Sequence, residues 1–180
     1  MRKVLYIFGL LTDADVEWMA RTGIRRRLAD GEVVIAEGRP ADYIVLLLEG
    51  ELLISAKGFG DIARVGVGEI VGEVSLVDSA PPSATVTAQR ECLALFLDKK
   101  ILTHKLETDT AFGYRFYRAL AIFLADRLRA TRQLPSVGER GLADESLILH
   151  DELDPAILDM SSSAGERFNR LLKALIGHEA

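Results

Sequence analysis

Glycine, carboxylate and hydroxyl residues gather near the middle of the chain, in a pattern suited to holding an anion. Gly72 lets the backbone approach a ligand closely, and the carboxylate residue Glu73 follows it. A short helical turn is predicted to follow, and the first amides of a helix have no partner within it. After two prolines, Ser83 and Thr85 offer further donors at the start of a predicted strand. The stretch 68–88 therefore predicts an anion site built largely from backbone amides.

Two other chemistries have weaker support in the sequence. The histidines at 104, 150 and 178 are far apart and no paired cysteines exist, so a metal site has no local pattern behind it. Cys92 lies in the apolar run Cys92–Leu97 with no histidine beside it. We expect Cys92 to be a core residue rather than a nucleophile.

Three charged residues lie near the predicted site. Glu37 and Asp42 flank a turn and could form a pair of acids. Arg64 precedes the site in a strand and could reach toward it. A charge on the solvated face of the strand is the expected alternative.

The composition indicates a globular protein of ordinary size. The chain has 180 residues, of which 49% are hydrophobic, a formal net charge of -5 and a single cysteine. The negative charge argues against a surface built to bind nucleic acid, and the single cysteine excludes an intramolecular disulfide. The basic and apolar start, Met1–Phe8, lacks a small-x-small cleavage site, and no apolar run reaches the roughly 20 residues that span a bilayer. A mature cytoplasmic protein is expected.

Short apolar runs separated by glycine, proline and aspartate predict a β-sandwich or barrel, for which a small double-sheet roll is chosen. Helices are predicted before the strands, at about 13–22, and after them, at 101–106, 110–132 and 164–176, the last with Ser161–Ser163 as its cap. Predicted strands are Ile24–Leu28, Val33–Ala36, Tyr43–Leu48, Leu52–Ala56, Ile62–Val67, Thr85–Ala88 and Cys92–Asp98. In the helix 110–132, the predicted apolar stripe consists of Phe112, Phe116, Leu120, Phe123 and Leu128. The charged residues of this helix, Arg115 and Arg127 among them, lie largely off that stripe.

The central stretch resembles the phosphate-binding cassette of cyclic nucleotide-binding domains. Gly72-Glu73-Val74-Ser75-Leu76 and Pro81, Ser83-Ala84-Thr85-Val86 fit the pattern of that cassette. A second part of the family pattern fits Gly31–Gly38 and Asp42–Leu52. This part of the resemblance implies that Glu37 and Asp42 belong to a turn of the roll, which is preferred to a pair of acids. The resemblance covers about residues 12–132 and is closest to stand-alone bacterial members of the cyclic AMP receptor protein class. It implies an α+β fold, a β-roll of jelly-roll type flanked by helices.

The resemblance also implies how a ligand would bind. Glu73 would accept a hydrogen bond from the ribose 2′-hydroxyl, and amides near Val74, Ser75 and Ser83 would meet the cyclic phosphate. The arginine that grips this phosphate in the family is replaced by Pro82, which has neither a charge nor an N–H. The predicted ligand-binding set is Gly72, Glu73, Val74, Ser75, Pro82, Ser83, Ala84 and Thr85.

The boundaries expected for the chain are a cyclic nucleotide-binding-like domain at 1–132 and an acidic helical extension at 133–180. In the resembled family the helix matching Thr110–Arg132 commonly forms a dimer seam, so a homodimer is expected. From Glu139 to Ala180 nine acids stand against four bases, so the extension predicts a protein partner and not a DNA-binding helix. The leading hypothesis is a non-enzymatic sensor of a nucleotide-like or other anionic ligand, with no metal and no fixed cofactor. A ligand-free interaction scaffold stays open, and an enzyme with a cupin-like cavity is a third alternative.

Overall fold

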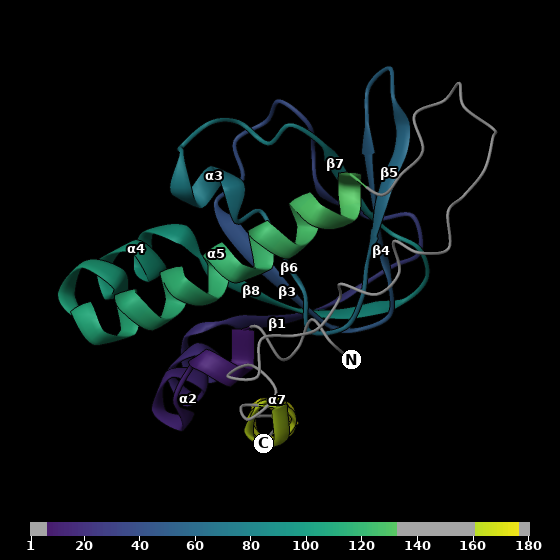
Figure 1. The fold of residues 1–180 in the computed structure, drawn as a ribbon. Coiled ribbons are helices and arrows are strands. Elements are labelled where there is room, and N and C mark those ends of the chain that lie inside the picture. The colour runs from purple at the N-terminus through teal and green to yellow at the C-terminus, as the bar shows by residue number, and fades with distance from the viewer. Residues whose placement is uncertain (1–6, 133–160, 177–180) are drawn as a thin grey trace, which may run out of the picture.

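The computed structural model describes residues 7–132 and 161–176, and two four-stranded antiparallel sheets form its centre (Figure 1). The first sheet has the order β1 (Ile24–Leu28), β8 (Cys92–Asp98), β3 (Tyr43–Glu49), β6 (Ile70–Val71). The second has the order β2 (Val33–Ile35), β7 (Thr85–Ala88), β4 (Leu52–Ala56), β5 (Gly60–Val65). The helices are α2 (Asp13–Thr22), α3 (Val74–Val77), α4 (Lys99–Thr108), α5 (Thr110–Arg132) and α7 (Ser161–Ile176). The predicted β-roll with flanking helices is confirmed.

The central strands β3 and β8 of the first sheet are buried on both faces, which explains why they are apolar almost throughout. Val45 and Leu47 of β3 face the second sheet and form the interior of the roll together with Phe96 of β8. The alternate residues, Ile44 and Leu46 among them, face a larger core that the helices cover. Strands with two buried faces lose the alternation of apolar and polar residues.

Two strands differ from the prediction. The strand predicted at Ile62–Val67 begins and ends two residues earlier, because the chain reverses at the tight turn before Gly60 and pairs with β4 from there to Val65. The strand β6 was not predicted at all. It has two residues, Ile70 and Val71, which pair with Leu46 and Val45 of β3, and so short a segment carries no periodicity.

The helix α2 begins and ends where the sequence indicates. The Thr12 hydroxyl accepts a hydrogen bond from the Asp15 N–H, and the Asp15 carboxylate accepts one from the Thr12 N–H, which closes a capping box. Gly23 ends the helix by donating its N–H to the Met19 carbonyl. Val16, Met19 and Ala20 form its buried side.

The other helices correct two predictions. Leu128 was expected in the buried stripe of α5, yet its side chain is 68% exposed, because five residues after the buried Phe123 it points to a different side of the helix. Ser161–Ser163 were expected to precede the last helix, but α7 already begins at Ser161. Cys92 is buried, as expected. Among the described residues, every helix is too short or too polar to cross a bilayer.

Candidate functional site

The cassette begins at a glycine that the fold requires. Gly72 follows β6 with a φ of 83°, a conformation that L side chains rarely adopt. A Cβ added there would lie 3.0 Å from the Tyr43 carbonyl oxygen and 3.1 Å from the Cδ1 atom of Ile35. This conformation lets the chain turn sharply from β6 into α3, and the next residue, Glu73, is buried.

The Glu73 carboxylate is buried and paired with an arginine of α5. Its side chain is 2% exposed, and the Nη1 atom of Arg127 lies 2.5 Å from its Oε1 atom. Burial raises the pKa of Glu73 above its ordinary value, although the Arg127 guanidinium acts to lower it. Thus the residue predicted to bind a ribose hydroxyl is a partly compensated buried acid whose Oε1 atom contacts another helix.

Arg127 is held in place by more than this ion pair. Its Nη2 atom donates to the Ile70 carbonyl at 3.3 Å, and its guanidinium lies 4.6 Å from the centre of the Phe123 ring. The sequence placed Arg127 off the apolar stripe, with the other charges of α5, and gave no reason to assign it to the site. Its position four residues after Phe123 was the available signal, because residues four apart share a helix face.

Ser75 connects the cassette to α4. Its hydroxyl donates to the Gly72 carbonyl at 3.2 Å and accepts from the Nζ atom of Lys99 at 2.7 Å. Burial lowers the pKa of Lys99, against the attraction of Asp42, Glu73 and Asp78. The Ser75 hydroxyl therefore serves to position α3 against α4.

The second half of the cassette is fastened to the turn between β2 and β3. The Pro82 carbonyl accepts from the Gly38 N–H at 2.8 Å, and the Thr85 hydroxyl accepts from the Glu37 N–H at 3.2 Å. The Glu37 carboxylate in turn accepts from the Lys57 N–H. These contacts place Pro82 and Thr85 beside the turn that contains Glu37 and Gly38. Glu37 therefore has a structural role in this turn, as the family resemblance implied.

Val74, a predicted ligand contact, and Arg64, which could have reached the site, both lie outside these contacts. Val74 is 51% exposed at the start of α3. Arg64 does not enter the site, because it pairs with Glu51 and its side chain is 64% exposed. The interpretation of Arg64 as a solvated charge is thereby confirmed.

A cavity of about 520 Å³ borders the outer side of the cassette. The cassette contributes Ser75 and Pro81 to its wall, and α4 contributes Lys99 and His104. A second cavity of about 430 Å³ opens at the end of the roll, where Ile35, Tyr43 and Phe96 line it. The cassette thus has space next to it on the α4 side, and Gly72 and Glu73 lie toward the roll.

Comparisons with known proteins support the fold described above. Residues 25–109 match the family model described as "Cyclic nucleotide-binding domain". A cAMP-dependent protein kinase regulatory subunit of Blastocladiella emersonii is 33% identical over 118 residues, which is 63% of this chain and 29% of that protein. The chain therefore spans less than a third of that curated relative.

Similar solved structures are covered over most or all of their own length. The crystal structure of a cyclic nucleotide-binding domain from Methylobacillus flagellatus has a TM-score of 0.67 at 27% identity, covering 77% of this chain and 85% of its own. The N-terminal domain of a transcriptional regulator from Streptomyces coelicolor A3(2) has a TM-score of 0.58 at 28% identity, covering 78% of this chain and 100% of its own.

Proposed function

Because residues 25–109 belong to the cyclic nucleotide-binding domain family, we propose that the chain is a non-enzymatic regulatory protein that binds a cyclic nucleotide or a similar anion between Gly72 and Thr85. Glu73 would accept the ribose hydroxyl, and backbone amides of the cassette and of the loop 82–85 would hold the phosphate. These are the groups that a sugar phosphate needs, a carboxylate acceptor and unpaired amide donors.

The observation that carries this proposal is the ion pair between Glu73 and Arg127. It joins the predicted ligand contact directly to α5, from a buried position on the cassette. A ligand hydroxyl that binds the same carboxylate changes the free energy of the Arg127 contact. Binding in the cassette is thereby linked to the position of α5, as a sensor requires.

Affinity should be low compared with a site that has the phosphate arginine. Pro82 supplies no charge, and its carbonyl is engaged with Gly38. A hydrogen bond to a charged group contributes about 1.5–3 kcal/mol, so its loss weakens binding by roughly ten- to a hundredfold or more.

The outer face of α5 is the proposed output and dimer surface. Tyr114 is 66% exposed, Tyr117 45% and Leu128 68%, and all three lie on the side of α5 that faces away from the sheet. Exposed aromatic side chains along one helix face are typical of a surface that packs against another chain. A homodimer through Thr110–Arg132 is therefore part of the proposal.

The alternative of a ligand-free scaffold is favoured by one specific feature. Arg127 already satisfies one oxygen of Glu73 and leaves its side chain only 2% exposed, so the chain itself occupies part of the predicted ribose contact. In that case α5 would be fixed on the roll, and its outer face alone would bind a partner.

Calorimetric titration with cyclic AMP, cyclic GMP and cyclic dinucleotides separates the two functions. A sensor gives heat of binding at millimolar ligand or below, and Glu73→Gln, which keeps the shape of the side chain, should weaken it. The matched control is Glu51→Gln, since Glu51 pairs with Arg64 away from the cassette. Absence of binding to every ligand in the panel would reject the sensor in favour of the scaffold.

A further inference from the structure

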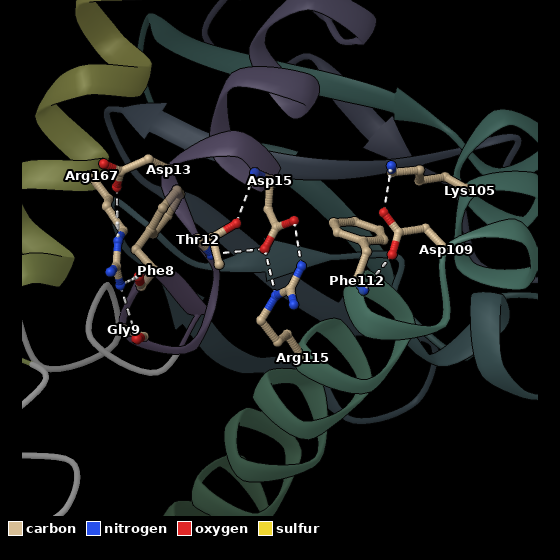
Figure 2. A network of polar contacts seen from close by, with 10 residues as sticks. All are labelled: Phe8, Gly9, Thr12, Asp13, Asp15, Lys105, Asp109, Phe112, Arg115 and Arg167. Carbon is tan, nitrogen blue, oxygen red and sulfur yellow. Dashed lines mark hydrogen bonds and ion pairs between the residues drawn. The ribbon is translucent and has the colours of Figure 1, made fainter.

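The first turn of α2 binds arginines from two other helices, as Figure 2 shows. Asp15 receives Arg115 of α5, with the Nε atom 2.7 Å from Oδ2 and the Nη2 atom 2.8 Å from Oδ1. This two-point contact is strong, and the Asp15 side chain is only 6% exposed. Burial raises the pKa of Asp15, but the hydrogen bonds from Arg115 and Thr12 outweigh it and hold that pKa below its ordinary value.

Asp13, two residues earlier, receives arginines of α7. The Nε atom of Arg167 lies 3.1 Å from Oδ1 and the Nη1 atom of Arg170 lies 2.5 Å from Oδ2. Arg167 also donates from Nη1 to the carbonyls of Phe8 and Gly9, each at 3.0 Å (Figure 2). Those carbonyls belong to the helical turn at residues 7–10, where carbonyls without an intrahelical partner are expected.

An apolar contact accompanies these polar ones. Phe168 packs its ring edge-on against Phe8, with 5.2 Å between the ring centres. The buried residues of α7 belong to the same core as those of α2 and α5; they are Ala164, Phe168, Leu171 and Leu175. The helix α7 therefore docks on the opposite end of the chain, through contacts made to residues 7–20 (Figure 1).

The two docking contacts share one small structural unit. The Oδ2 atom of Asp15 that binds Arg115 also accepts the Thr12 N–H and so closes the capping box. Asp13 lies between these two residues. If Arg115 shifts, the carboxylate of Asp15 follows or loses a partner, and the backbone that carries Asp13 changes with it.

We propose that α7 is a releasable helix whose docking depends on the position of α5, with the turn Thr12–Asp15 as the coupling element. A movement of α5 that disturbs Arg115 weakens the contacts of Asp13 with α7. Because coupling between two contacts is reciprocal, release of α7 in turn weakens the contact between Asp15 and α5. The inference extends the proposed function by giving α5 an intramolecular target. It does not need a ligand in order to hold.

Hydrogen exchange of the full chain tests this coupling without any ligand. In Arg115→Gln, the amides of α7 should exchange at least about fivefold faster than in the unaltered chain, the lower end of typical coupling effects. The amides of β8 report global stability and should change less. Arg118→Gln is the matched control, because Arg118 is an exposed arginine on the same helix. It should leave α7 unchanged.

A second variant examines the reverse direction. Asp13→Asn removes the charge that Arg167 and Arg170 share and leaves Thr12, Asp15 and Arg115 untouched. The first two turns of α5 should then exchange faster together with α7. Unchanged α7 exchange in Arg115→Gln, or equal acceleration of α7 and β8, would overturn the coupling. Should Arg115→Gln fail to fold, Arg115→Lys keeps the charge but loses the two-point contact, and the same two criteria apply.

Discussion

Replacing Arg127 by methionine should leave the Glu73 carboxylate buried without its cation. The Glu73 side chain is 2% exposed and that of Arg127 is 27% exposed. Breaking a buried ion pair by removing one partner costs about 3–5 kcal/mol, and because Arg127 is partly exposed we expect the lower end, about 3 kcal/mol. Methionine retains an unbranched apolar stem next to Phe123, so the loss should come mainly from the charge and the hydrogen bonds.

Urea unfolding near neutral pH measures this loss directly. Trp18, the single tryptophan, packs edge-on against Phe112 with 5.4 Å between the ring centres, so its fluorescence reports the helical core. Arg118→Met removes an exposed arginine from the same helix and should cost no more than about 0.5 kcal/mol. Equal losses in the two variants would refute the argument from burial.

The same variant should have a distinctive pH dependence. Burial raises the pKa of Glu73, and the Arg127 cation works against that rise, so its removal should raise the pKa further. A carboxyl with a raised folded-state pKa binds its proton more tightly when folded, and stability then increases as the pH falls through that pKa. The penalty of Arg127→Met at about pH 7 should therefore shrink toward about pH 5.

The double variant Glu73→Gln with Arg127→Met isolates the cause. With no carboxyl at position 73, the loss of unfolding free energy caused by Arg127→Met should no longer change with pH. A penalty in the single variant that stays constant or grows as the pH falls would show that the buried carboxylate is not its source.

Three further results are expected. Pro82→Arg, which restores the phosphate arginine of the family, should raise cyclic nucleotide affinity by roughly tenfold or more in calorimetry, and an unchanged affinity would contradict a phosphate site at this loop. Gly72→Ala should destabilise the chain by about 1–2 kcal/mol for its positive φ plus the cost of the contact with Tyr43, whereas Gly58→Ala, at a φ of 85° with open space around it, should show only the backbone part in thermal unfolding. Tyr117→Glu on the exposed face of α5 should convert a dimer to a monomer in light scattering, and an unaltered chain that is already monomeric would reject the dimer.

Local features of the roll could be read from the sequence because each has a local cause. Turn glycines with positive φ, such as Gly31, Gly38 and Gly50, separate short apolar runs, and the boundaries of β1, β4, β7 and β8 follow from that punctuation. The start of α2 has a local cause as well, because the Thr12 hydroxyl and the Asp15 carboxylate, three residues apart, form a capping box. The two-residue strand β6 could not be predicted, because it is defined by its pairing with β3 and has no sequence pattern of its own.

The site could be predicted only in part, because its central contact is long-range. The cassette residues Gly72 and Glu73 follow a recognisable pattern, but Arg127 lies 54 positions further along the chain. A charge off the apolar stripe of an amphipathic helix is ordinarily solvated, so the sequence favoured the wrong environment for Arg127. For the same reason the contacts of Arg115 with Asp15 and of Arg167 with Asp13 could not be predicted, since these pairs are 100 and 154 positions apart.

The way in which α5 is anchored bears on the choice between sensor and scaffold. A buried ion pair stabilises a fold little, and well-packed apolar side chains at the same positions would hold a helix as firmly or better. In a rigid scaffold the Glu73–Arg127 contact would therefore be a weak way to hold α5 on the roll. In a sensor the contact is suitable, because a carboxylate can divide its hydrogen bonds between a ligand hydroxyl and a guanidinium. A ligand can shift α5 only as far as it binds one of the two arrangements better than the other, and sharing this carboxylate supplies that difference.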